Sequence, residues 1–289
     1  MLFRSIGRRL AEAGVVPDAW TFRLAVRLAQ ADRRLRAGEY RFAEAASPFA
    51  VVSRLVRGDV FTYGLTFREG LTLYEMSTVF ERSGLGTAAA FETAAKNAAL
   101  IRALDPDASS LEGYLFPSTY AMPRHAGAAG TVRAMVTQFE HVFDAKHRDA
   151  AAALAMPVRD VVTLASIVEK ETAQPAERPI VAAVYRNRLK IHMPLQCDPT
   201  VIYALMLAGQ WNGNLTHDNM QIDSPYNTYR YAGLPPGPIA SPGRASLDAA
   251  LHPADVPYLY FVSRNDGTHV FAATLAEHNK NVAAFQKHR

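Results

Sequence analysis

The chain has 289 residues, 49% of them hydrophobic and 20% charged, which predicts a globular protein with one large or two modest hydrophobic cores. Its single cysteine, Cys197, excludes an internal disulfide. The nine histidines form neither a zinc-binding spacing nor a His-Glu-x-x-His pattern, so we expect neither a metal nor another cofactor. No apolar run approaches about 18 residues, so we expect no membrane span and no signal peptide in the chain.

Positive charge is concentrated near the N-terminus. Residues 1–60 hold 11 Lys and Arg against 6 Asp and Glu, whereas the rest of the chain is nearly balanced and the total is +4. Such a segment can bind nucleic acid, anionic lipid or an anionic wall polymer, or it can be a solvated arginine-rich helix face. Because no nucleic-acid motif and no interleaving of aromatic with basic residues accompanies it, we expect no nucleic-acid partner.

The first hundred residues contain a weak internal repeat with an offset of about 70 residues. Each copy predicts a short amphipathic helix that ends at a glycine, a turn, and a second helix that begins near a phenylalanine. An extended segment, residues 60–67, leads into the second copy, and none precedes the first, so we expect the natural protein to continue upstream of Met1. The corresponding positions are Phe3, Ile6, Leu10, Gly14 and Phe22 in the first copy, and Leu73, Met76, Phe80, Gly84 and Phe91 in the second.

Between the copies, residues 36–42 predict a turn and a short strand. Ser47 and Pro48 then begin a helix that ends at Gly58. Residues 1–108 are thus predicted to form an N-terminal region of two related βαα-type units that divide near residue 60. Units of this kind suit carbohydrate or cell-wall binding.

An aromatic-rich run at residues 111–120 includes Glu112 and Tyr114 and predicts a loop with a short strand. It is either a packed aromatic cluster or a platform on which a sugar ring stacks. A helix is predicted next, over residues 131–147, with its apolar residues on one stripe.

The segment 158–172 predicts a helix almost without a polar face. Glu169 shares its stripe with Val162 and Ala165, and a carboxyl on an apolar face holds its proton more tightly. Glu171 lies about 200° further round, so the two carboxylates cannot both face one ligand, and the helix favours a single catalytic acid. Alternatively, the helix end emerges into solvent and both glutamates are ordinary surface charges.

Residues 198–209 give the clearest helix signal, with Asp198 at the N-cap and Gly209 beyond the last turn. A capping role is therefore the stronger interpretation of Asp198, whereas Gln196 has no such role and is a candidate ligand contact. Residues 224–243 are rich in proline and glycine and predict a rigid loop that presents Tyr226, Asn227 and Thr228 to a polar substrate.

The C-terminal part of the chain predicts two further helices and a hairpin. The helices cover residues 246–250 and 275–288, and strands 258–262 and 269–271 flank a turn at Asn265, Asp266 and Gly267. Short strands among helices, without βαβ alternation, predict an α+β fold for the whole chain.

Six ordered motifs resemble those of the endolytic murein transglycosylases, the YceG-like family. They are residues 111–117 (LEGYLFP), 165–172 (ASIVEKET), 195–200 (LQCDPT), 226–229 (YNTY), 233–239 (GLPPGPI) and 258–261 (YLYF). The resemblance implies a mixed α+β catalytic domain at residues 109–289, after a LysM-like region at residues 1–108 whose first unit is truncated. Members have Asp where this chain has Ser118, and Ser or Thr where it has Cys197.

The resemblance also implies the reaction. It is the endolytic, non-hydrolytic cleavage of the β-1,4 bond between N-acetylmuramic acid and N-acetylglucosamine, which leaves 1,6-anhydro ends and terminates nascent strands. The resemblance gives Glu169 as the one catalytic acid and base. We expect the substrate groove to be lined by Glu112, Tyr114, Gln196, Asp198, Tyr226, Asn227 and Thr228.

The partners implied are peptidoglycan glycan strands and peptidoglycan synthases (penicillin-binding proteins). The implied location is the periplasmic face of the bacterial inner membrane, reached through an anchor outside this chain. Two other functions stay open from the residues. One is a hydrolytic muramidase that pairs Glu169 with Glu112 or Asp198. The other is a non-catalytic wall-binding protein in which residues 1–110 bind peptidoglycan.

Overall fold

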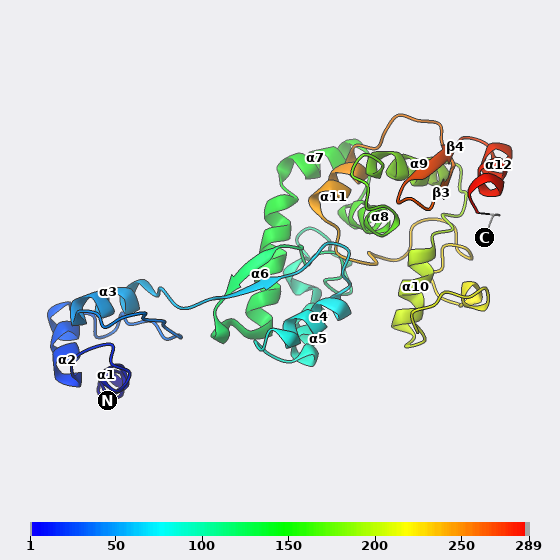
Figure 1. The fold of residues 1–289 in the computed structure, drawn as a ribbon. Coiled ribbons are helices and arrows are strands. Elements are labelled where there is room, and N and C mark those ends of the chain that lie inside the picture. The colour runs from blue at the N-terminus through cyan, green and yellow to red at the C-terminus, as the bar shows by residue number, and fades with distance from the viewer. Residues whose placement is uncertain (1, 287–289) are drawn as a thin grey trace. The chain divides into compact units, whose positions relative to one another are not determined.

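The computed structural model describes residues 2–286, and side chains from residue 5 onward (Figure 1). It contains helices and two small two-stranded sheets, β1–β2 and β3–β4, so the predicted α+β class is confirmed. In chain order the elements are α1 (Leu2–Glu12), α2 (Ala19–Leu28), α3 (Pro48–Arg57), β1 (Tyr63–Thr66), α4 (Leu73–Arg82), α5 (Ala88–Ala95), β2 (Thr119–Met122), α6 (Gly127–Val142), α7 (Ala145–Ala153), α8 (Val158–Glu171), α9 (Arg178–Lys190), α10 (Asp198–Leu207), α11 (Arg244–Leu251), β3 (Tyr260–Ser263), β4 (His269–Ala272) and α12 (Leu275–Phe285).

By contacts the chain divides into two compact units. One unit contains the chain up to Leu65 together with Tyr120–Gly127, and the other contains Thr66–Thr119 and everything from Ala128 onward. The predicted division at residue 108, between a LysM-like region and a catalytic domain, stays a prediction.

The first unit is built from α1, α2 and α3 around a core that includes Phe22, Val26 and Val51. Ser47 caps α3 as predicted, because its Oγ accepts a hydrogen bond from the backbone N–H of Ala50 at 3.3 Å. The predicted strand at residues 36–42 is wrong, since this segment forms no ladder. Strand geometry persists only where a neighbouring strand pairs its backbone groups in register, and no such ladder forms here.

The internal repeat is confirmed at the level of helices. α1 and α2 form one helix–turn–helix, and α4 and α5 form another. Each turn begins at a glycine in the left-handed region, Gly14 at φ 68° and Gly84 at φ 72°, and each second helix fully buries its phenylalanine, Phe22 or Phe91. The side chain of Phe3 lies outside the described part of the chain.

The second unit is organised around α8, which contacts α7, α9, α10 and α11 (Figure 1). Every residue from Val161 to Val168 is buried. The helix predicted over residues 131–147 is wrong at its end, because α6 stops at Val142. Asp144 then caps α7 by accepting a hydrogen bond from the backbone N–H of His147 at 3.2 Å, so a capping residue divides one apolar stripe into two helices.

The C-terminal part forms the predicted helices and hairpin. β3 and β4 pair antiparallel, with Tyr260 opposite Ala272 and Ser263 opposite His269. Asn265 and Gly267 in the turn both have positive φ, as a tight hairpin turn requires. Residues 287 and 288 of the predicted last helix lie outside the described residues. Between α10 and α11 the chain is irregular except for a short 3₁₀ turn, Asp218–Gln221, so the predicted loop at residues 224–243 is confirmed as a segment without helix or strand.

Within residues 2–286 no single helix combines the length and apolarity needed to cross a membrane. α7 and α8 reach that length and apolarity only when counted together, and they are bent by 96° relative to each other.

Candidate active site

The last turn of α8 carries two glutamates with different surroundings, as the helical spacing predicted. Glu169 faces the start of α9 and the segment that leads into α11. Glu171, the last residue of the helix, faces Tyr185 of α9. One helix end therefore offers two carboxylates to two separate environments.

The side chain of Glu169 is buried, and both of its carboxylate oxygens accept hydrogen bonds. Its side chain is 6% exposed, and Arg178 donates to Oε1 at 3.0 Å. Oε2 accepts hydrogen bonds from the backbone N–H of Gly243 at 3.0 Å and from the Oγ of Ser246 at 2.7 Å. The apolar stripe predicted for Glu169 is therefore only part of its surroundings, because segments distant in sequence bring three donors to this carboxylate. These contacts tie α8 to α9 and α11.

A second acid lies next to this ion pair. Glu69 Oε2 is 3.8 Å from the same Arg178 guanidinium, and its side chain is 49% exposed. Burial raises the pKa of Glu69, the negative charge of Glu169 raises it further, and Arg178 opposes both. Two carboxylates therefore share one buried arginine, which connects α8 and α9 with the turn before α4.

Glu171 has a different environment. The phenol of Tyr185 donates a hydrogen bond to Oε1 at 2.6 Å, and Cys197 lies beside it, buried. Burial raises the pKa of Glu171, and hydrogen bonds from Cys197 and Tyr185 offset only part of that rise. A carboxyl of this kind keeps a protonated fraction at higher pH than an exposed glutamate does, which is a requirement for a general acid.

Glu171 also lines a polar cavity of about 290 Å³, which is near the lower limit of small-molecule sites. The residue as a whole has intermediate exposure. The polar lining comes from α8, α9, α10, α12, the segment before α10 and the loop after it: Glu171, Tyr185, Arg188, Gln196, Asp198, Tyr229 and His278. Two of the predicted substrate-binding residues, Gln196 and Asp198, are therefore brought together with Glu171.

Asp198 is not the N-cap of α10, so that prediction is wrong. Cys197 occupies the cap position without a side-chain cap bond, and Asp198 is the first helical residue. Its Oδ1 instead accepts a hydrogen bond from the Tyr229 phenol at 2.5 Å, on the cavity wall. Gln196 reaches the cavity from a left-handed backbone conformation, φ 49°, which its N–H stabilises by donating to the carbonyl of Thr228.

Asn227 and Thr228 shape the loop that carries Tyr229. The Nδ2 of Asn227 donates to the carbonyls of Met220 and Ile222 at 2.9 Å each, and the residue is fully buried. Thr228 Oγ1 accepts from the backbone N–H of Cys197 at 3.0 Å. These two predicted substrate contacts therefore pack inside the protein and hold the cavity wall in place.

Glu112, Tyr114 and Tyr226 lie together at a separate small cavity of about 20 Å³, which has room for about one water and none for a sugar. Glu112 accepts hydrogen bonds from the backbone N–H of Leu73 and from Tyr203, each at 3.1 Å. Burial raises its pKa to about 8. Tyr114 is buried and donates to Asp105 at 2.6 Å.

The residues of the Glu171 cavity that were not selected from the sequence include Tyr185, Arg188, Phe261 and His278. Arg188 is buried and donates to the carbonyls of Leu259 and Leu195 at 2.7 Å each, so its guanidinium holds two walls together. Burial lowers the pKa of His278, and Arg188 lowers it further, which favours a neutral imidazole at the cavity. The only available signal was the motif at residues 258–261, which includes Phe261.

Comparison with known proteins gives the family. The model of the YceG-like family matches residues 1–284. The chain belongs to the YceG-like family. The crystal structure of a YceG-like protein from Listeria monocytogenes is similar to it, with a TM-score of 0.69, 32% sequence identity, and coverage of 96% of this chain and 94% of that one.

Two curated relatives of this YceG-like chain carry an enzyme name. One from Bacillus subtilis, named endolytic murein transglycosylase, is 43% identical over 171 residues, which are 59% of this chain and 46% of the relative. One from Streptococcus pneumoniae, with the same name, is 34% identical over 180 residues, 60% of this chain and 32% of the relative. The matched region thus spans less than half the length of either relative.

Proposed function

We propose that this YceG-like protein is an endolytic peptidoglycan lytic transglycosylase and that Glu171 is its catalytic acid and base. The observation that carries the proposal is a buried carboxyl with a raised pKa at the edge of a polar cavity. The names of the two relatives support the substrate, and the 290 Å³ cavity suits a sugar-sized group.

The proposed reaction uses one carboxyl twice. Protonated Glu171 donates its proton to the glycosidic oxygen between N-acetylmuramic acid and N-acetylglucosamine, and the bond from that oxygen to the muramoyl C1 breaks. The carboxylate then takes the proton from the C6 hydroxyl of the muramoyl ring, whose oxygen bonds to C1 and closes the 1,6-anhydro ring. Acid–base catalysis of this kind supplies about 10²–10⁴ in rate. The tethered C6 hydroxyl takes the place of water and of a second carboxylate.

Glu171 suits this role better than Glu169, the residue given by the motif resemblance. Both oxygens of Glu169 already accept hydrogen bonds, one of them from a buried arginine, so a substrate would first have to break an ion pair. Glu171 pairs with a neutral phenol and lies at a cavity. Glu169 is kept as the alternative acid.

A second function, a hydrolytic muramidase, is favoured by one observation. Asp198 lies in the same cavity as Glu171 and gives the site two carboxylates, the pair that a hydrolase needs. The two functions differ in product, because a hydrolase adds water and leaves a reducing end where a transglycosylase leaves an anhydro end.

The test is mass spectrometry of glycan strands after digestion by the unmodified chain, by Glu171→Gln and by Glu169→Gln. Internal cuts with 1,6-anhydro ends, lost only in Glu171→Gln, are the expected result. Loss only in Glu169→Gln would transfer the role to that residue, and reducing ends would identify a muramidase. Strands left intact by all three proteins, with binding retained, would support a wall-binding protein.

The cellular setting is part of the same proposal. We place the activity at the periplasmic face of the inner membrane, where it terminates nascent strands beside peptidoglycan synthases, with residues 1–108 as a LysM-like glycan-binding region. Cell fractionation and co-purification with penicillin-binding proteins test the location and the partner. Binding of the isolated glycan polymer to variants of the whole chain altered in residues 1–108 tests the glycan-binding region.

A further inference from the structure

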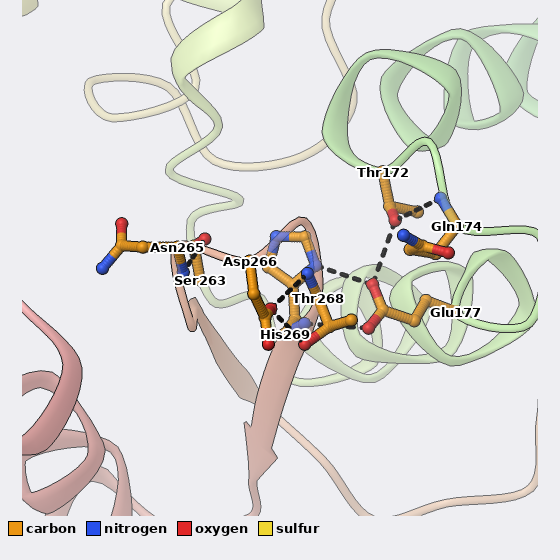
Figure 2. A network of polar contacts seen from close by, with 8 residues as sticks. All are labelled: Thr172, Gln174, Glu177, Ser263, Asn265, Asp266, Thr268 and His269. Carbon is orange, nitrogen blue, oxygen red and sulfur yellow. Dashed lines mark hydrogen bonds and ion pairs between the residues drawn. The ribbon is translucent and has the colours of Figure 1, made fainter.

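Glu171 belongs to a closed ring of contacting residues, some of which line the cavity and some of which lie outside it. This ring, called here the Glu171 ring, consists of Glu171, Thr172, Glu177, His269, Phe261 and Tyr185. Its members come from the end of α8, the loop before α9, α9 itself and the β3–β4 hairpin. Figure 2 shows the polar half of the ring, in which Glu177 lies between Thr172 and His269.

The polar half is held by one carboxylate. Glu177 Oε2 accepts hydrogen bonds from Thr172 Oγ1 at 3.0 Å and from His269 Nδ1 at 2.7 Å, and Oε1 accepts from the His269 backbone N–H at 2.8 Å. The side chains of Glu177 and His269 are 12% and 13% exposed. The residue after Glu171 and the first residue of β4 are therefore attached to the same side chain.

The negative charge of the Glu177 carboxylate determines which ring nitrogen of His269 carries a proton. Burial acts to raise the pKa of Glu177, but the hydrogen bonds from His269 and Thr172 outweigh it, so the pKa lies below the ordinary value. An ionised carboxylate only accepts hydrogen bonds, so Nδ1 of His269 carries a proton. A buried charge-assisted hydrogen bond of this kind is stronger and more directional than a neutral one.

The aromatic half closes the Glu171 ring. The His269 ring meets Phe261 edge-on, with centroids 5.5 Å apart and planes at 88°. Phe261 meets Tyr185 in the same way, at 5.9 Å and 90°, and Tyr185 donates to Glu171. Edge-to-face contacts have preferred geometry, so a displaced imidazole displaces the phenol that orients the carboxyl.

We propose that Glu177 and His269 are positioning residues for Glu171, which they fix from both sides through the Glu171 ring. The proposal rests on the proposed function, in which Glu171 is the acid. A carboxyl on the last residue of a helix has no following turn to hold it, and helix ends fray. Misplacement of a reacting group by about 1 Å can cost about a hundredfold in rate, so a device that fixes this carboxyl has a direct catalytic effect.

The test compares kcat and KM on soluble, uncrosslinked glycan strands for a matched set of variants. His269→Ala removes the donor, and His269→Asn retains an N–H at nearly the position of Nδ1. Glu177→Gln replaces the accepting carboxylate by an amide, whose NH₂ group is itself a donor and faces the donors of Thr172 and His269. The control is Thr268→Ala, which removes a 2.6 Å hydrogen bond to Asp266 in the same turn without touching Glu177 (Figure 2).

We expect His269→Ala and Glu177→Gln to lower kcat by about 10- to 100-fold with KM changed less than about twofold. His269→Asn should recover most of kcat, and Thr268→Ala should match the unmodified chain. Thermal unfolding midpoints identify any variant whose loss of activity comes from unfolding. If His269→Ala is such a variant, kcat of His269→Asn is compared with kcat of the unmodified chain and of Glu177→Gln.

Four results would overturn the proposal. An unchanged kcat in His269→Ala would show that the ring does not position the acid. Equal losses in His269→Asn and His269→Ala, or a loss confined to KM, would assign His269 a structural or substrate-binding role. Full activity in Glu171→Gln would overturn the proposed function as well, whereas an inactive Glu171→Gln beside a fully active His269→Ala would overturn the positioning role alone.

Discussion

Tyr185 donates its phenolic hydrogen to Oε1 of Glu171 over 2.6 Å, from the helix that packs beside the one that Glu171 ends. The phenol stabilises the carboxylate form, whereas burial stabilises the neutral acid and has the larger effect. The protonation of Glu171 is therefore a balance between two opposing contributions. Substitution at Tyr185 removes one of them and leaves the other in place.

Tyr185→Phe should shift the alkaline limb of the kcat profile to higher pH. The variant keeps the ring contact with Phe261 but loses the hydrogen bond that lowers the pKa of Glu171, so that pKa rises further. An acid with a higher pKa stays protonated to higher pH, and the limb moves with it. Measuring kcat from pH 5 to 9 gives the shift. Tyr203→Phe is the control, because its phenol bonds Glu112. A limb that moves equally in both variants, or to lower pH in Tyr185→Phe, would contradict the assignment.

Glu169→Gln should destabilise the fold more than it impairs catalysis. The substitution removes the buried ion-pair partner of Arg178 and leaves only the half-exposed Glu69 at 3.8 Å, and breaking a buried pair costs about 3–5 kcal/mol. We expect the free energy of unfolding to fall by about 3 kcal/mol in urea titrations, with kcat lowered less than tenfold. Glu171→Gln gives the matched comparison, with the larger loss in kcat. A reversal of the two patterns would exchange the roles of the two glutamates.

Glu112 should make stability depend on pH in the neutral range. Its pKa is about 8 in the folded chain against an ordinary 4.5, so the folded protein binds this proton more tightly than the unfolded chain does. The resulting stability is fully present below about pH 4.5 and is lost as the pH rises through 8, by at most about 5 kcal/mol.

Glu112→Gln should remove this loss, because the amide keeps the shape of the protonated acid without a titrating group. Urea unfolding of both proteins at pH 5 and pH 9 tests the expectation. Every other buried acid titrates in both chains, so the difference between them reports Glu112 alone. Equal losses of stability in the two proteins would contradict the buried, raised-pKa description.

The sequence predicted those features that depend on neighbouring residues. The cap of α3, the helix–glycine–helix repeat and the hairpin turn at Asn265 each follow from side chains within a few positions. Segment 36–42 shows where this local reasoning failed. Its alternating residues are compatible with a strand, but a strand needs a partner, and none pairs with it in the described chain.

The choice between Glu169 and Glu171 could not be made from the helix alone. The helical spacing separated the two correctly, but it could not tell which one faced donors and which one a cavity. Ser246, which donates to Glu169, is 77 residues away in sequence, and Tyr229, which donates to Asp198 on the wall of the Glu171 cavity, is 31 residues from it. Tertiary contacts over such separations determine the local environment, and neither the helical spacing nor the motif that pointed to Glu169 contains that information.

Asp198→Asn should separate the two proposed chemistries. In a transglycosylase the substituted residue only loses charge at the cavity wall, where the Asn carbonyl can still accept the hydrogen bond from Tyr229. We therefore expect kcat to fall less than about tenfold, with 1,6-anhydro ends unchanged. In a hydrolase that uses Asp198 as its second carboxylate, the same change should cost at least about a hundredfold. Gln196→Leu is the companion variant, because it alters the same wall without removing a carboxylate. Loss of cleavage in Asp198→Asn alone, with reducing ends in the parent digest, would replace the transglycosylase by a muramidase with Glu171 and Asp198 as its pair.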